Sequence, residues 1–413
     1  MVLSLPIGIA IGIATAVCMT LFSSVPLVLI PQYCFTAIDS FPLLAIPFFT
    51  LAGNLMGGSG ISRRIVSFAE SLVGFIVGGL AMVTVTACMF FAAISGSGPA
   101  TVSAIGSFMI PQMKAKQYDG AFAAAITAAA GSIGVIIPPS IPFVLYGVIT
   151  GASVSEMFLA GIIPGIMIGI ALMIACSFVA RKKNYPVATA GFSFGAVCRS
   201  FRESFWALMV PVIIMGGIYG GIFTPTEAAV ATVFYALFVG FFVYRELTPA
   251  AVVQALRETI TVNGSATYII ALSMSFATFL TVEGIPMRIG EWIVGFSSSK
   301  YVVLLLINIF FLIVGCFIDN LSSMIILTPI FLPVVNSMGV DTVHFGLFMT
   351  VALAIGFITP PFGSNLFVAA TVSRERIDDI AKNVFIFVFA MVVVLFIVTY
   401  IPWFSMVLVN LMR

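Results

Sequence analysis

Long apolar stretches dominate this sequence and constrain its fold more than any other feature. Hydrophobic residues make up 61% of the chain and charged residues only 8%, so windows of about 20 apolar residues recur along it. A β-barrel is excluded, because its strands alternate apolar and polar residues. We therefore expect an all-α polytopic protein that spans a lipid bilayer. The formal net charge of +2 gives no basic face, so nucleic acid is not an expected partner.

About eleven windows are long and apolar enough to be candidate spans. They are 3–22, 42–58, 72–92, 120–149, 157–180, 205–222, 226–244, 262–282, 301–318, 343–371 and 383–411. Three further stretches are amphipathic, which is typical of helices that lie in the membrane interface: 59–71, 247–260 and 284–298. The longest polar stretch, 181–203, carries five basic residues and is the strongest candidate for a cytoplasmic loop.

The sequence also contains an internal repeat, because residues 97–143 and 319–365 align without a gap at an offset of 222. The aligned residues are of rarer types in this chain and pair Pro111 with Pro333, Asp119 with Asp341, Gly134 with Gly356, and Pro138-Pro139 with Pro360-Pro361. We interpret residues 1–180 as a first repeat, 181–225 as a cytoplasmic linker with a connecting helix, and 226–413 as a second repeat.

Each repeat contains a polar cluster followed by an apolar stretch too short to be a second span. The clusters are Ser95–Thr101 and Asp319–Ser323. Non-helical backbone is tolerated at membrane depth only where it is buried in protein or lines a cavity. The clusters therefore predict re-entrant helical hairpins at 93–115 and 319–338; a kinked helix or an ordinary surface turn is the alternative.

A long span interrupted by tandem prolines follows each hairpin, at 120–149 and 343–371. Pro138-Pro139 and Pro360-Pro361 remove amide donors and disfavour the helical region for the preceding residue, which predicts a broken helix in each repeat. Free carbonyls at such breaks coordinate Na⁺, and helix N-termini attract an anion. Interrupted segments at matching positions of two halves are typical of a transporter's binding site.

The charge distribution predicts that the two repeats are inverted. Lys114 and Lys116 place the base of the first hairpin on the cytoplasmic side, whereas the base of the second, 334–343, has no Lys or Arg. Six of the candidate spans lie between the hairpins, however, and an even number would open both to the same side. One of the six is therefore expected not to cross, and the Gly-rich 205–222 is the weakest.

Several motifs together resemble one known family. They are the segments beginning Phe41-Pro-Leu-Leu-Ala-Ile-Pro, Ser95-Gly-Ser-Gly-Pro-Ala-Thr, Gly134-Val-Ile-Ile-Pro-Pro-Ser, Gly217-Ile-Tyr-Gly-Gly-Ile-Phe-Thr-Pro-Thr-Glu and Thr359-Pro-Pro-Phe-Gly-Ser-Asn. The chain resembles, over nearly its whole length, the large membrane subunit (M subunit, DctM-like) of tripartite ATP-independent periplasmic (TRAP) transporters.

This resemblance implies a multi-pass protein of the bacterial inner membrane with the fold of the divalent anion/sodium symporters. It implies Na⁺-driven uptake of a small organic acid, of the sialic acid or C4-dicarboxylate type, by an elevator mechanism. Scaffold and transport domains would interleave across both repeats. The implied partners are a small four-helix membrane subunit (Q type) and a periplasmic substrate-binding protein (P type), with Na⁺ as coupling ion and no other cofactor.

Carried over residue by residue, the resemblance implies two Na⁺-and-substrate half-sites. The first comprises Ser95, Ser97, Thr101 and Ser140, and the second comprises Asp319, Asn320, Ser322, Ser323, Thr359, Gly363, Ser364 and Asn365. Asp319 adjoins an apolar span, so Na⁺ coordination or charge compensation is its first expected role and a helix cap the alternative.

Other charged and polar residues have simpler expected roles. Asp119 and Asp341 are expected to cap the helices that follow, and Glu227 to begin one. Arg64 and Arg288 are expected to anchor amphipathic helices at the interface. His344 is expected to pack or cap.

Three competing functions bear on the same features. A stand-alone Na⁺/anion symporter of the same fold would need no binding protein. An enzyme is not expected, because Ser97 has no general base nearby in sequence. A transition-metal site is not expected either, because the chain has one histidine and unclustered cysteines. A channel is disfavoured because no repeated selectivity filter is present.

Overall fold

The computed structural model describes residues 6–185, 191–289 and 299–413, and this part of the chain is helical without a strand. The expected all-α architecture is confirmed. Seven helical segments are long and apolar enough to cross a membrane. The predicted amphipathic stretch 284–298 lies outside the described residues from position 290 onward.

The helices have the following bounds: α1 (Ile7–Phe22), α2 (Leu29–Ile38), α3 (Ala45–Gly58), α4 (Ile61–Val73), α5 (Gly79–Ser95), α6 (Gly98–Ala115), α7 (Gly120–Gly131), α8 (Ile141–Thr150), α9 (Val154–Lys182), α10 (Phe194–Tyr219), α11 (Pro225–Phe238), α12 (Pro249–Val282), α14 (Lys300–Gly315), α15 (Asn320–Ser337), α16 (Thr342–Gly356), α17 (Ser364–Ser373), α18 (Ile377–Tyr400) and α19 (Trp403–Met412). A 3-10 turn, Phe41–Leu44, leads into α3, another, Ser132–Val135, follows α7, and a π-helical turn, Val239–Val243, extends α11.

Two helical hairpins are present, and each is longer than predicted. In the first, Thr84 near the start of α5 lies beside Met113 near the end of α6, with 3.6 Å between Oγ1 and Sδ. In the second, the Lys300 ammonium at the start of α14 donates to the Gly339 carbonyl just beyond α15, at 3.2 Å. These contacts join the start of α5 to the end of α6 and the start of α14 to the end of α15, so α5 and α14 are the first arms of the two hairpins.

This corrects the prediction that 72–92 and 301–318 cross the membrane as separate spans. Helix α5 has 17 residues and α14 has 16. At 1.5 Å per residue these helices are about 25 Å long, which is short of the roughly 30 Å of a hydrocarbon core. The chain turns at the polar cluster that ends each helix and returns along it.

The two predicted broken helices are confirmed. In the first, α7 passes through the 3-10 turn 132–135 and an irregular stretch, 136–140, before α8 begins. In the second, α16 ends at Gly356 and α17 begins at Ser364. The tandem prolines lie inside both breaks, as expected from the amide donors that they remove.

Three other predictions about spans are wrong. The stretches predicted separately as 247–260 and 262–282 form, from Pro249 onward, the single 34-residue helix α12. No proline follows Pro249 within it, and the helix tolerates Gly264, its one glycine. The segment 205–222 lies mostly within the 26-residue helix α10, which is long and apolar enough to cross a membrane, so its weakness as a candidate span is not supported. The predicted span 383–411 is interrupted by Pro402, so α18 and α19 are separate helices.

The amphipathic segment 59–71 forms the helix α4, and Arg64, one of its two arginines, contacts other parts of the chain. The Arg64 guanidinium pairs with Glu246 at 2.9 Å and lies 3.8 Å from the centre of the Tyr244 ring. Arg64 thus joins α4 to the connection between α11 and α12, and its expected position at the membrane interface stays a prediction.

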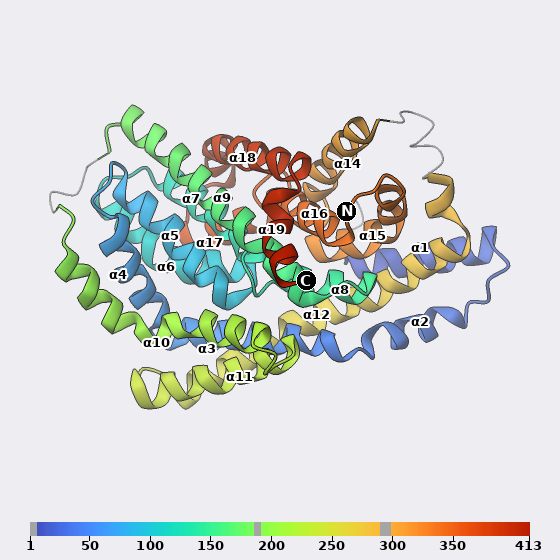
Figure 1. The fold of residues 1–413 in the computed structure, drawn as a ribbon, viewed down its shortest axis with the longest axis horizontal. Helices are drawn as coiled ribbons and strands as arrows, with labels where there is room; N and C mark the ends of the chain where they lie inside the picture. The colour runs from blue at the N-terminus through green and yellow to red at the C-terminus, as the bar shows by residue number, and fades with distance from the viewer. Residues whose placement is uncertain (1–5, 186–190, 290–298) are drawn as a thin grey trace.

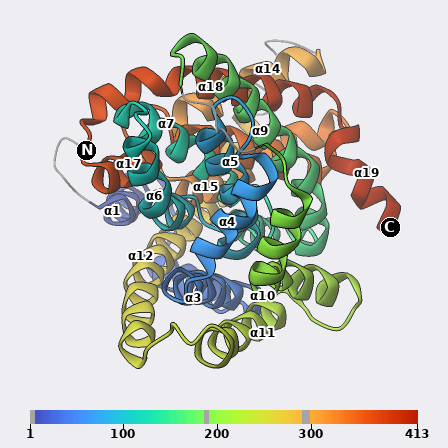
Figure 2. The same ribbon diagram turned by 90° about the vertical axis from the view of Figure 1, so that its left-hand side faces the viewer.

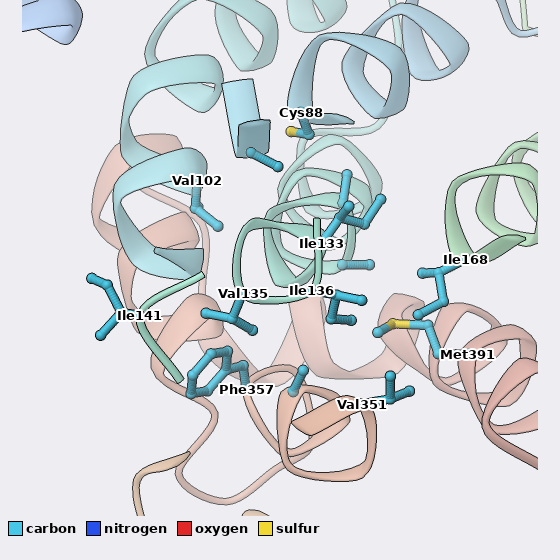
Figure 3. Packing of buried hydrophobic residues seen from close by; sticks show 14 of the residues in the cluster. Cys88, Val102, Ile133, Val135, Ile136, Ile141, Ile168, Val351, Phe357 and Met391 are labelled. Carbon is cyan, nitrogen blue, oxygen red and sulfur yellow. The ribbon is translucent and has the colours of Figure 1, made fainter. Parts of the chain in front are cut away.

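The helices divide into two sides. Figures 1 and 2 agree in placing α3, α10, α11 and α12 along one side, with the hairpins, the broken helices and α18 on the other. One continuous apolar core runs through both sides, and both halves of the chain contribute to it. Figure 3 shows part of it, where Val102, Ile133 and Ile136 of the first half approach Val351 and Phe357 of the second.

Candidate functional site

The tip of the first hairpin is a self-contained polar turn. After Ser95, Gly96 adopts a φ of 64°, which L side chains rarely tolerate, and Ser97 is the extended residue that precedes α6. The Ser95 Oγ lies 2.9 Å from Thr101 Oγ1, and the Thr101 hydroxyl donates to the Ser97 carbonyl at 2.8 Å. Ser95 and Thr101 are buried, and these contacts satisfy both hydroxyls.

This tip is attached to the break in the first broken helix. The Ile141 amide donates to the Gly96 carbonyl at 3.3 Å. Beside it, the buried Ser140 hydroxyl donates to the Val135 carbonyl at 2.6 Å and accepts from the Phe143 amide at 3.4 Å, so Ser140 caps α8. The break at the prolines therefore leaves the Ile141 amide free of a helical partner, and this amide binds the first tip.

The tip of the second hairpin follows the same plan. Asp319 precedes α15, and its Oδ2 accepts from the Leu321 amide at 3.0 Å, so the expected alternative role as a helix cap is observed. The Phe362 amide in the second break donates to the Cys316 carbonyl at 3.3 Å. Tip and broken helix are thus joined backbone to backbone in both halves.

The second tip differs from the first because many of its buried polar atoms have no hydrogen-bond partner within the described residues. Asn320 is 1% exposed, yet neither its amide nitrogen nor its amide oxygen is paired. The same holds for the hydroxyls of Ser322, Ser323 and Ser364 and for Asn365 Oδ1. Buried polar atoms are nearly always paired, and leaving one unpaired costs about 1–3 kcal/mol. A cluster of them points to a ligand.

Asn365 connects the two halves. Its amide nitrogen donates to the Ala128 carbonyl and to the Ser132 hydroxyl, both at 3.1 Å, at the end of α7. A Cβ on Gly98, at the start of α6, would lie only 3.1 Å from Asn365 Oδ1. The second broken helix is therefore packed against the first hairpin and the first broken helix.

Two cavities adjoin the tips. The larger, of about 270 Å³, is lined by Ser97 of the first tip, Asp319 and Asn320 of the second, and parts of α3 and α12. The smaller, of about 220 Å³, is lined by Asp319, Phe357 and Ser364 among others. Asp319 is exposed to both. Among the residues that line either cavity, Asp319 has the only ionisable side chain.

The structure brings part of the predicted set to the cavities. Ser97, Asp319, Asn320 and Ser364 line them. Others do not line a cavity: Ser95 and Thr101 are buried within the first tip, Ser140 is buried at the start of α8, and Ser322 and Ser323 are buried within α15. The Thr359 hydroxyl donates to the Ile355 carbonyl at 2.8 Å, and Gly363 precedes α17; neither lines a cavity.

The sequence-based prediction missed one wall of the larger cavity. Thr50 of α3 and Asn263 and Ser265 of α12 face the tips across it. A detectable signal was present, because Asn263-Gly264-Ser265 is a polar interruption inside an apolar helix. The prediction divided α12 at residue 261, which placed this triplet at the end of a span.

The other predicted roles are confirmed where the structure tests them. Asp119 accepts from the Phe122 amide at 3.0 Å and Asp341 from the Val343 amide at 2.7 Å, so both cap helices. Glu227 forms a capping box with Thr224 at the start of α11. His344 is buried, with Nδ1 2.7 Å from the Ser405 hydroxyl.

Comparisons with known proteins agree on one family. The family described as "Tripartite ATP-independent periplasmic transporter, DctM component" matches residues 1–404. An isethionate TRAP transporter permease protein, DctMQ, from Oleidesulfovibrio alaskensis is 45% identical over 97% of this chain, which spans 63% of that relative.

Further relatives have different named substrates. A C4-dicarboxylate TRAP transporter large permease protein from Pseudomonas aeruginosa is 42% identical, over 88% of this chain and 85% of its own. A sialic acid TRAP transporter large permease protein from Vibrio cholerae is 37% identical over the same shares. Among solved structures, the YdaH transporter of Alcanivorax borkumensis matches with a TM-score of 0.68 and 14% identity over 96% of each chain, a likeness of fold alone.

Proposed function

Because this chain belongs to the DctM component family of tripartite ATP-independent periplasmic transporters, a family of membrane permeases, we propose that it couples uptake of a small organic acid to a Na⁺ gradient. The acid is of the C4-dicarboxylate or sialic acid type, as named for the relatives. A periplasmic binding protein delivers it, a small four-helix subunit completes the membrane complex, and an elevator motion carries it across the inner membrane.

The observation that carries this proposal is the cluster of unpaired polar atoms at the second tip. Hydroxyl and amide oxygens beside the Asp319 carboxylate make an oxygen-rich environment, which suits Na⁺. The Asn320 amide nitrogen is a donor, and a cation cannot satisfy a donor. An acid group can. The second tip therefore supplies ligands for both a cation and an anion.

Charge explains why ion and acid would bind together. No Lys or Arg lines either cavity, so an incoming anion meets the Asp319 carboxylate with only the N-termini of α6, α8, α15 and α17 to attract it. Two like charges 4 Å apart repel by about 4 kcal/mol at an effective dielectric of 20. A Na⁺ beside Asp319 removes this repulsion, which makes acid binding depend on Na⁺.

The packing supports an elevator motion. Both tips are hydrogen-bonded to their broken helices, and Asn365 joins the two broken helices. Among the described residues, no hydrogen bond joins either hairpin or either broken helix to α3 or α12. The hairpin side can therefore slide along α3 and α12 without breaking hydrogen bonds at that boundary.

Uptake in proteoliposomes tests the proposal. The chain is reconstituted with a small subunit and a binding protein, and uptake of radiolabelled succinate, isethionate and N-acetylneuraminate is measured with Na⁺ or K⁺ outside. Asp319→Ala is compared with Asp119→Ala, which also removes a carboxylate that caps a helix but lies away from both cavities.

We expect Na⁺-dependent uptake of one acid, its loss in Asp319→Ala and its retention in Asp119→Ala. Uptake without Na⁺ would contradict the coupling, and equal losses in both variants would remove Asp319 from the site. Na⁺-dependent uptake without the binding protein would instead identify a stand-alone Na⁺/anion symporter.

A further inference from the structure

We propose that Asn263 of α12 contacts the transported acid from the scaffold side and sets its affinity on one side of the membrane only. This inference rests on the proposed function. It concerns the wall of the larger cavity that faces the hairpin tips, which is formed by Thr50 of α3 with Asn263 and Ser265 of α12. These three residues are called the scaffold wall below.

Among the polar side chains of the scaffold wall, Asn263 has the most unused hydrogen-bonding capacity. The Thr50 hydroxyl donates to the Ile46 carbonyl at 2.8 Å, and the Ser265 hydroxyl donates to the Thr261 carbonyl at 3.1 Å, so both protons are used within their own helices. The Asn263 nitrogen donates one proton to the Thr259 carbonyl at 2.9 Å. Its second proton and its oxygen have no partner among the described residues.

This spare capacity faces a suitable ligand. Across the cavity, the Asn320 nitrogen offers a donor to the acid group, and Asp319 offers a cation site. The free Asn263 proton can donate to an oxygen of the acid, and its oxygen can accept from a substrate hydroxyl. The cavity of about 270 Å³ then holds the acid between two amides, one on each wall.

The two amides belong to different parts of the molecule: Asn320 is attached to the second broken helix, and Asn263 is attached to α12 and α3. Asn320 is carried by the second tip, whose turn is hydrogen-bonded to the second broken helix at Phe362. Asn263 is fixed to α12, and α12 is fixed to α3 by the Asn54 amide, which donates to Thr259 Oγ1 at 3.0 Å. Where α3 meets the first tip, the contact is van der Waals: a Cβ on Gly53 would lie 3.3 Å from the Ser95 Cα.

An elevator motion would therefore separate the walls. The acid would keep its contacts with the tips and lose the contact with Asn263 when the tips move to the other side of the membrane. Loss of one hydrogen bond to a charged acceptor corresponds to about a tenfold change in affinity. Asn263 thus changes affinity for substrate arriving at, or leaving from, one side, whereas Asn320 acts on both.

Kinetics measured from both sides in proteoliposomes test this inference. Influx is driven by liganded binding protein outside, and efflux is measured from preloaded vesicles into unliganded binding protein. Because the binding protein is outside the vesicles in both measurements, both report on transporter molecules inserted in the same orientation, with the side that meets the binding protein facing outward. The probe is whichever of succinate, isethionate and N-acetylneuraminate the wild-type complex takes up. Asn263→Ala and the isosteric Asn263→Asp are compared with Asn54→Ala.

Asn54→Ala is the matched control, because it removes an amide hydrogen bond at the same helix crossing but does not line the cavity. We expect Asn263→Ala to raise the half-saturating acid concentration about tenfold in one direction, with the other direction and the Na⁺ half-saturation unchanged. Asn263→Asp should act in the same direction and more strongly, because its carboxylate repels the acid.

Equal shifts in both directions, no shift in either Asn263 variant, or the same shift in Asn54→Ala would overturn the inference. Size-exclusion profiles verify that each variant is folded, and Asn263→Asp preserves the shape of the side chain if the alanine variant is not. Uptake by the wild-type complex is measured first, and its failure to depend on Na⁺ would overturn the proposed function itself. The variants are compared only after this measurement.

Discussion

Gly134→Ala tests how closely the first tip is seated on the first broken helix. A Cβ at residue 134 would lie 2.6 Å from both the Ser97 carbonyl oxygen and Thr101 Oγ1, and 2.9 Å from the Ser97 carbonyl carbon. Ordinary van der Waals contact begins at about 3.4 Å, so the tip would have to move by about 0.8 Å. Two of the three atoms belong to backbone, which cannot rotate away.

The expected loss of stability follows from three contributions. Overpacking of a buried position typically costs about 1–3 kcal/mol. Weakening of the hydrogen bond from Thr101 to the Ser97 carbonyl, now 2.8 Å long, adds about 1 kcal/mol. Replacing glycine by alanine restricts the unfolded chain and returns about 0.5–1 kcal/mol. The net change is a destabilisation of about 1–3.5 kcal/mol.

Thermal unfolding in detergent, followed by tryptophan fluorescence, measures this change. The matched control is Gly216→Ala in α10, where a Cβ would meet nothing within 4 Å and the only contribution left is the gain in helix stability. Gly134→Ala should lower the unfolding midpoint, whereas Gly216→Ala should raise it or leave it unchanged. The reasoning is refuted if the Gly134→Ala midpoint equals or exceeds that of wild type.

Two further predictions concern contacts outside the first tip. Asn365→Ala removes two buried hydrogen bonds, to Ser132 and to a carbonyl at the end of α7, and should destabilise the protein by about 2–3 kcal/mol in the same thermal assay; an unchanged midpoint would contradict this. Arg413→Ala removes ion pairs with Glu156 and Asp341, but the Arg413 side chain is 45% exposed. The loss of stability should therefore stay below about 1 kcal/mol and disappear at 1 M salt. A shift of the unfolding midpoint that persists at 1 M salt would disprove the surface character of these pairs.

Local chemistry explains which features could be predicted from the sequence. Pro138-Pro139 and Pro360-Pro361 act on their own backbone, so they locate both breaks without any knowledge of packing. The same holds for Asp119 and Asp341, whose carboxylates cap the helices that they precede. In these cases, the cause lies within a few residues of its effect.

Features that depend on packing could not be predicted in this way. Hydropathy counts α14 as a span, because its composition is that of a crossing helix. The contact of Lys300 with Gly339, which depends on packing, shows that the chain returns. The role of Asn263 depends on which elements enclose a cavity. The contrast between a paired Thr101 and an unpaired Asn320 depends on atoms brought together by the fold. Residue type alone does not distinguish these two.

The hairpin assignment of α14 also accounts for the orientation problem that hydropathy leaves open. With α14 returning to its own side, the described crossings between the hairpins are the broken helix α7–α8, then α9, α10, α11 and α12. An odd number of crossings predicts that the two hairpin bases lie on opposite faces of the membrane, with Arg245 and Arg257 on the cytoplasmic face together with 181–203. In this topology, the two tips enter the membrane from opposite faces. It agrees with the structure, in which Ser97 of the first tip and Asn320 of the second line one cavity together with residues of α3 and α12.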